Sequence, residues 1–131
     1  MNALQSISRG AMSSWATQNR APRLLRIFLG ATFIYAGWDK ASDPGFLTQG
    51  EPTYIGTQLA AFAANSPIGF LLNQILDQAT YVGIFIMVAE FAVGIATLLW
   101  VAPATAAFGG LLISITLWLS SSFYTTPYFL A

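Results

Sequence analysis

The chain has 131 residues, of which 56% are hydrophobic and 8% are charged, with a formal net charge of zero. An average soluble domain carries about 25% charged residues, so this composition indicates one compact membrane domain with no basic surface for nucleic acid. The sequence contains no Cys and no His, which excludes disulfides, iron–sulfur clusters, His-ligated haem, the usual zinc sites and Ser/His or Cys/His nucleophile pairs. We therefore expect neither enzymatic activity nor a bound cofactor from this chain alone.

Residues 1–22 are expected to form a segment on the cytoplasmic surface of the membrane. Four side chains recur there at helical spacing: Leu4, Ile7, Ala11 and Trp15. With Arg9 beside them, they predict an interfacial helix over residues 2–18, and a disordered tail is the alternative.

Residues 23–41 are expected to be the first membrane span. Their apolar part, residues 24–38, is short, but Arg26 and Lys40 can direct their charges toward the two interfaces. A cleaved signal peptide is the alternative interpretation. The Trp-Asp-Lys triplet at 38–40 argues against it, because a signal-peptide cleavage site has small residues.

The connection at residues 42–79 is expected to contain short amphipathic helices outside the membrane, because a structureless loop of this length is uncommon. The first helix is indicated by an apolar stripe: Ile55, Leu59 and Phe62. Ser66 and Pro67 then fit an N-cap and a first helical turn. They precede a second apolar stripe: Ile68, Leu71, Leu72, Ile75 and Leu76.

Residues 80–100 and 103–124 are expected to be the second and third spans. Glu90 is the only charged residue in the second span, and the third span has none. Since the two segments nearly adjoin and Pro103 fits the first turn of a helix, we expect a tight antiparallel hairpin. Residues 125–131 are expected to form an outer C-terminal turn.

The distribution of charge predicts the orientation in the membrane. Four arginines and no acid precede or enter the first span: Arg9, Arg20, Arg23 and Arg26. Residues 39–79, in contrast, carry four acids and one lysine. The positive-inside rule then places the N-terminus in the cytoplasm and, after three spans, the C-terminus outside. We expect a multi-pass protein of a bacterial or archaeal cytoplasmic membrane.

Glu90 most requires a functional explanation, because it lies near mid-membrane in the second span. An ionisable group at that depth costs about 2.5–3.5 kcal/mol and usually serves a function. It could carry protons or bind a quinone headgroup by a hydrogen bond; alternatively, a protonated carboxyl could tie two helices together. Its partner stays open: helical rise puts Lys40 and Arg26 each about 10–15 Å away in depth, and hydroxyl groups or another subunit are equal alternatives.

Further residues complete this candidate site. Asp39 and Lys40 follow Trp38, either as a solvated interfacial pair or at the mouth of an outer pocket shared with the aromatic end of the third span. The candidate quinone or proton site comprises five residues: Tyr35, Trp38, Asp39, Lys40 and Glu90. Small residues allow membrane helices to approach closely, and we expect five glycines to serve this packing: Gly30, Gly37, Gly83, Gly94 and Gly109. Glu90 is accordingly expected to face the bundle interior.

Three stretches resemble one known family, the DoxX/DoxD-like membrane proteins. Residues 26–47, RIFLGATFIYAGWDKASDPGFL, are similar to its opening signature, and residues 89–99, AEFAVGIATLL, match its second span at Glu90 and Gly94. Residues 114–130, SITLWLSSSFYTTPYFL, resemble the end of its third span. The resemblance implies a four-helix bundle in the cytoplasmic membrane and, for the DoxD branch, an association with thiosulfate:quinone oxidoreductase. It also implies a fourth span, so a chain ending at Ala131 is expected to be truncated or completed by a neighbour.

These features support three functional interpretations. The first is a small accessory subunit of a respiratory or photosynthetic electron-transfer assembly, which packs against lipid and other membrane subunits. The second is a subunit that carries a quinone or proton site in an oxidoreductase of the thiosulfate:quinone type, with a quinone at an interface and redox centres on its partners. The third is a small-solute transporter, which the single intramembrane glutamate supports only weakly.

Overall fold

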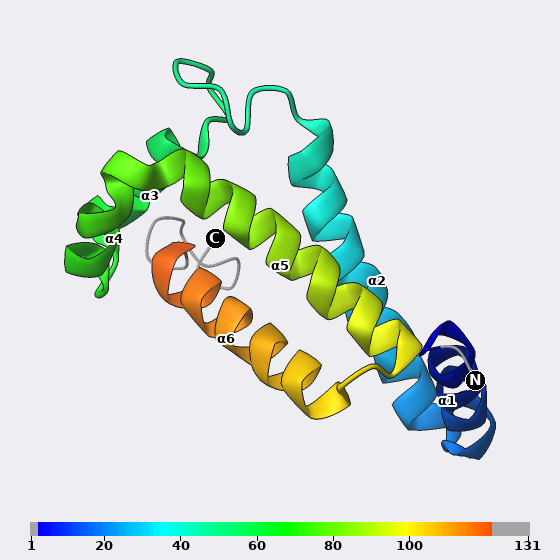
Figure 1. The fold of residues 1–131 in the computed structure, drawn as a ribbon. Coiled ribbons are helices and arrows are strands. Elements are labelled where there is room, and N and C mark those ends of the chain that lie inside the picture. Colours follow the sequence, from blue (N-terminus) through cyan, green and yellow to red (C-terminus); the bar gives the residue numbers. More distant parts are fainter. Residues whose placement is uncertain (1–2, 122–131) are drawn as a thin grey trace.

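The computed structural model describes residues 3–121, and every regular element in this range is a helix (Figure 1). The elements are α1 (Ala3–Thr17), α2 (Arg20–Ser42), α3 (Ile55–Asn65), α4 (Gly69–Ile75), the 3-10 helix η1 (Leu76–Gln78), α5 (Ala79–Leu99) and α6 (Pro103–Ser121). The expected all-helical fold class is confirmed. The end of the expected third span at 122–124 and the expected turn at 125–131 lie outside the described residues.

α5 is the central helix of the bundle, with α2 along one side and α6 along another (Figure 1). α1 lies at the end where α2 begins and α5 finishes, whereas α3 and α4 cover the opposite end of α5. The helix expected over residues 2–18 is thus present as α1. The bundle has an arginine-rich end and an end covered by short helices.

Two helical stretches are long and apolar enough to cross a membrane: Gly69–Leu99, with 31 residues, and Pro103–Ser121, with 19 residues. About 20 apolar residues span the hydrocarbon core of a bilayer. α2 is long enough to span a membrane, with 23 residues. Arg23 and Arg26 interrupt its apolar sequence, however, so α2 is not among the helical stretches that qualify as spans by composition. By length and composition, α5 and α6 therefore match the second and third expected spans.

Residues 100–102 form the tight hairpin between α5 and α6 that the sequence predicted. Trp100 and Ala102 adopt left-handed backbone conformations, with φ of 57° and 44°. The Val101 N–H closes the turn on the Ala96 carbonyl at 3.0 Å. Because a left-handed conformation costs a residue other than glycine about 1–3 kcal/mol, neighbouring contacts must hold Trp100 in place.

α2 and α5 approach each other closely at Gly30 and Gly94. A Cβ at Gly94 would lie 2.9 Å from the Gly30 carbonyl oxygen, and a Cβ at Gly30 would lie 3.2 Å from the Gly94 carbonyl oxygen. Only glycine therefore fits this contact without a shift of one helix. The close approach brings the facing sides of α2 and α5 within reach of each other's polar groups.

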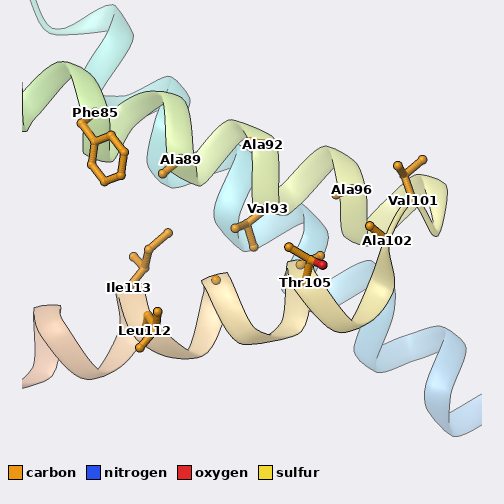
Figure 2. A pocket seen from close by; sticks show the side chains of 12 residues that line it. Phe85, Ala89, Ala92, Val93, Ala96, Val101, Ala102, Thr105, Leu112 and Ile113 are labelled. Carbon is orange, nitrogen blue, oxygen red and sulfur yellow. The ribbon is translucent and has the colours of Figure 1, made fainter.

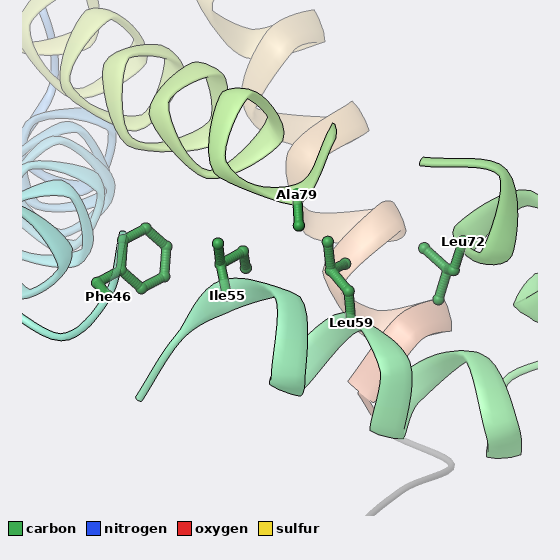
Figure 3. Packing of buried hydrophobic residues seen from close by; sticks show 5 residues of the cluster. All are labelled: Phe46, Ile55, Leu59, Leu72 and Ala79. Carbon is green, nitrogen blue, oxygen red and sulfur yellow. The ribbon is translucent and has the colours of Figure 1, made fainter. Parts of the chain in front are cut away.

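The buried apolar core lies at the end of the bundle that α3 and α4 cover (Figure 3). It consists of five residues: Phe46, Ile55, Leu59, Leu72 and Ala79. Ile55 and Leu59 belong to the first predicted stripe, and Leu72 belongs to the second. The short helices expected between the first two long helices are thus present, and their apolar faces pack against the start of α5.

The expected start of the second short helix at Ser66 is wrong. Ser66 is the C-cap of α3, and α4 begins at Gly69. The Ser66 hydroxyl accepts the Ile68 N–H at 3.1 Å and donates to the Leu119 carbonyl at 2.7 Å. These two bonds hold the turn between α3 and α4 and attach it to α6, so α4 starts only after this turn.

Candidate functional site

Glu90 occupies the face of α5 that packs against α2. Gly83, Glu90 and Gly94 share one side of the helix, and all three are buried. Only 1% of the Glu90 surface is exposed. Since Gly94 contacts Gly30 of α2, this side faces the bundle interior. The inward orientation of Glu90 agrees with the expectation from the sequence.

The partner that the sequence left open for Glu90 is Lys40. Lys40 Nζ donates to Glu90 Oε1 at 3.0 Å and to the Ala36 carbonyl at 3.3 Å. Helical side chains lean toward the N-terminus of their helix, so the long stem of Lys40 runs back along α2 to the depth of Glu90. The expected separation of about 10–15 Å counted helical rise alone and is wrong for Lys40.

The two side chains of this ion pair differ in their exposure. The Lys40 side chain is 22% exposed, whereas the Glu90 side chain is 1% exposed. Glu90 Oε2 is buried and has no hydrogen-bond partner among residues 3–121. Because buried polar atoms are nearly always hydrogen-bonded, this oxygen requires an explanation. Chemically, this oxygen can accept a proton or a hydrogen bond.

The other three residues of the candidate site do not converge on this pair. Tyr35 and Trp38 expose 69% and 63% of their surface, and Asp39 is also exposed. The aromatic end of the third span, which was expected to share an outer pocket with Trp38, lies outside the described residues. The structure thus joins Lys40 to Glu90 and leaves Tyr35, Trp38 and Asp39 at the surface of α2.

The glycines assigned to helix packing differ in how closely they are surrounded. Four of the five are buried: Gly30, Gly37, Gly83 and Gly94. A Cβ at Gly37 would lie 2.9 Å from the Phe91 ring of α5. Gly109 on α6 is only half-buried, and a Cβ there would meet Val93 at 3.3 Å. α5 therefore packs more tightly against α2 than against α6.

A second polar cluster surrounds Arg26, which was expected to direct its charge toward the interface and was one of the alternative partners for Glu90. Arg26 is 3% exposed. Its Nε donates to the Thr97 carbonyl at 2.9 Å, its Nη2 to the Leu98 carbonyl at 2.6 Å, and its Nη1 to Ser14 Oγ at 2.9 Å. The last carbonyls of a helix lack intrahelical partners and attract cations. Arg26 therefore caps the C-terminus of α5 and does not pair with Glu90.

The Arg26 guanidinium also contacts two indole rings. Its Cζ lies 4.0 Å from the centroid of the Trp15 ring and 4.8 Å from that of the Trp100 ring. Such cation–π contacts are strongest with Trp and increase when the cation is removed from water. They help to hold Trp100 in its left-handed conformation. The position of Arg26 inside an apolar segment was the signal in the sequence that could have indicated this cluster. The sequence did not predict that Trp15 and Trp100 would both contact the guanidinium.

A groove of about 420 Å³ lies between α5 and α6 (Figure 2). Small side chains line its α5 side, namely Ala89, Ala92 and Ala96, and Thr105 supplies the only hydroxyl of the lining. Neither member of the ion pair belongs to this lining. The residues that the structure describes thus offer an apolar groove and a separate polar pair, and they bring together no group of acids that could hold a metal ion.

Comparison with known protein families identifies the relatives of this chain. A family model described as TQO small subunit DoxD matches residues 22–128. The chain belongs to the DoxD family. The match runs from the first turn of α2 through α6 and includes Lys40 and Glu90, and it confirms the family resemblance seen in the sequence. Searches of curated proteins and of solved structures gave no match. DoxD membership and the apolar helices α5 and α6 together support a membrane protein.

Proposed function

We propose that this DoxD chain is a small accessory membrane subunit of an electron-transfer complex of the thiosulfate:quinone oxidoreductase type. The family match over residues 22–128 carries the proposal. The sequence has no Cys and no His with which to ligate a redox centre, so the electron carriers belong to partner subunits. The contribution of this chain is packing within a bacterial or archaeal cytoplasmic membrane.

In this proposal α2 spans the membrane together with α5 and α6. Two of its charged side chains are turned inward, Arg26 onto carbonyls of α5 and Lys40 onto Glu90. Its outward surface is rich in apolar side chains that suit lipid: Leu24, Leu25, Ile27, Phe28 and Trp38. The arginines at the start of α2 favour a cytoplasmic N-terminus, by the positive-inside rule.

Single-cysteine variants test this topology without interference, because the sequence has no native Cys. Ser13→Cys lies in α1, and Gln49→Cys lies in the connection between α2 and α3. We expect a membrane-impermeant maleimide to label Gln49→Cys in intact cells and Ser13→Cys only after permeabilisation. Labelling of both positions from the same side would contradict a membrane-spanning α2.

The accessory role is supported by the surfaces of the three long helices. Large apolar side chains remain exposed along α5 and α6: Tyr81, Phe85, Val88, Ile95, Phe108, Leu111, Ile115 and Trp118. The charged groups of Arg26, Lys40 and Glu90, in contrast, make their contacts inside the bundle. Exposed apolar faces of this kind suit lipid tails and the helices of neighbouring subunits.

A second candidate function is a proton or quinone site at the ion pair. It is favoured by the buried, unpartnered Oε2 of Glu90 and by the partial exposure of Lys40. Lys40 would donate a hydrogen bond to a quinone carbonyl that approaches from its exposed side. Glu90 would exchange the proton that accompanies reduction of this carbonyl, while the electrons come from a partner subunit.

Substitutions at the pair separate the two roles. Glu90→Gln and the double variant Lys40→Met/Glu90→Gln are compared with Asp39→Asn, a control at an exposed neighbouring acid. Complexes are isolated through a tag on this chain, and quinone reduction is expressed per assembled complex. An accessory role predicts unchanged reduction per complex in all three. Loss of reduction in complexes that keep their full subunit composition would overturn the accessory role and favour the site.

A further inference from the structure

α1 is attached to the bundle along one face near its C-terminal end. Arg26 donates to Ser14 Oγ at 2.9 Å, and its guanidinium lies over the Trp15 ring. Arg23 Nη2 donates to the Ala16 carbonyl at 3.0 Å. These contacts fix the rotation of α1 about its own axis.

The same face of α1 continues past these contacts toward its N-terminus. Leu4 and Ile7 share this face with Ala11 and Trp15, at spacings of three and four residues. They are nevertheless 80% and 39% exposed. Trp15 contacts Arg26 of the bundle, so Leu4 and Ile7 on the same face of α1 lie on the bundle side of the helix, beyond these contacts. α1 itself lies at the end of the bundle where α2 begins (Figure 1).

This end of the protein is also uniformly basic. Residues 1–38 contain four arginines and no acid. Arg9 lies on the side of α1 opposite to the Leu4 face, and Arg20 is exposed at the first position of α2. A helix with an apolar face and an arginine on its polar face, followed by a further exposed arginine, has the chemistry of a segment that lies in the interface of an anionic membrane.

We propose that α1 docks on the anionic phospholipid leaflet around the arginine-rich end of the bundle. Leu4 and Ile7 lie at the boundary between headgroups and acyl chains, and Arg9 and Arg20 lie near lipid phosphates. Arg26 is a positioning residue, because its contacts with α1 set the face that meets the lipid. The proposal rests on a membrane-embedded bundle and is independent of any role in electron transfer.

Fluorescent labels at single cysteines in the full chain test this docking. Leu4→Cys and Ser6→Cys, on opposite faces of α1, each carry a polarity-sensitive fluorophore. The proteins are reconstituted into vesicles of phosphatidylcholine, with or without phosphatidylglycerol. We expect the Leu4 label to emit at shorter wavelength and to be quenched by spin-labelled lipid, with larger effects when phosphatidylglycerol is present. The Ser6 label should retain the emission of a dye in water.

Arginine variants separate the charge effect from the orientation effect. The double variant Arg9→Gln/Arg20→Gln should lose the additional response to phosphatidylglycerol but keep the contrast between the Leu4 and Ser6 labels. Arg26→Gln should lose that contrast, because α1 can then rotate or detach. Arg26→Gln also removes the hydrogen bonds to the last carbonyls of α5. If this variant does not fold, Arg9→Gln/Arg20→Gln still tests whether α1 docks on anionic lipid.

Three results would overturn the proposal. The first is emission typical of water from both labels in anionic vesicles. The second is a wavelength shift of the Leu4 label that appears in detergent without lipid and grows with protein concentration, which would assign the face to a second copy of the chain. The third is a shift seen only in the assembled native complex, which would assign the face to a partner subunit.

Discussion

Lys40 Nζ lies 3.0 Å from Glu90 Oε1, so the last turns of α2 are joined to the middle of α5. At the other end of α2, Arg26 donates to the last carbonyls of α5. Between these two contacts, Gly30 and Gly94 bring the helix backbones together. α2 and α5 therefore form one unit whose axial register is fixed at three levels.

Removal of one member of the ion pair should destabilise the protein more than removal of both. Loss of one partner from a buried pair typically costs about 3–5 kcal/mol, because the other charge is left unpaired. Glu90→Gln should cost less than Lys40→Met, because the charge that it leaves, Lys40, is 22% exposed, whereas Glu90 is 1% exposed. Lys40→Met/Glu90→Gln removes both charges and should recover part of this loss. Thermal unfolding in detergent, followed by circular dichroism, measures the difference. A double variant as unstable as the sum of the single variants would argue against direct pairing.

The substitution Gly94→Ala should weaken the contact between α2 and α5. The new Cβ would lie 2.7 Å from Ile34 and 2.9 Å from the Gly30 carbonyl oxygen, and such overpacking typically costs about 1–3 kcal/mol. Gly109→Ala is the matched control, because its Cβ meets only Val93, at 3.3 Å. We expect a lower unfolding temperature for Gly94→Ala and little change for Gly109→Ala. Equal behaviour of the two variants would contradict the close approach of α2 and α5.

The substitution Arg26→Lys should weaken the attachment of α1 to the bundle, although it conserves the charge. An ammonium group cannot reproduce the planar arrangement of donors that serves the Thr97 and Leu98 carbonyls together with Ser14. The loss of hydrogen bonds from a charged group is expected to cost about 1.5–3 kcal/mol. Limited proteolysis within α1 should accelerate in Arg26→Lys and stay unchanged in the exposed control Arg20→Lys. Unchanged cleavage in both would mean that Arg26 does not hold α1.

Truncation of Leu72 should destabilise the packing of the short helices. Leu72 is 4% exposed in the core of Figure 3, whereas its neighbour Leu71 is 50% exposed. Leu72→Ala should cost about 2–5 kcal/mol, and Leu71→Ala should have a small effect. Chemical unfolding in a mild detergent compares the two. A larger effect at Leu71 would indicate that α4 packs through its other face.

The fold was largely predictable because the local signals agree with one another. Apolar periodicity identified α1, α3 and α4, and the apolar runs around Glu90 and after Pro103 identified α5 and α6. The turn at Ser66 was misplaced, because its hydroxyl bonds to the Leu119 carbonyl of a distant helix. A local capping pattern carries no information about such a partner.

The two residues of the ion pair were among the candidates from the sequence, but their contact was not predictable. Glu90 was recognisable because a charge in an apolar span is costly. Its pairing with Lys40 depends on the direction of a long side chain, and helical rise alone gave the wrong separation. Tyr35 and Trp38 were grouped with the pair by proximity along the chain, yet they lie exposed on the surface of α2.

Purification of the tagged chain from native membranes in a mild detergent tests the central claim most directly. Mass spectrometry identifies the proteins that co-elute, and a reduced-minus-oxidised spectrum detects their redox centres. We expect partner subunits that co-elute in fixed stoichiometry and show the spectrum of a redox centre. Elution of the chain alone, or as a homo-oligomer without a chromophore, would contradict its role as a subunit of an electron-transfer complex.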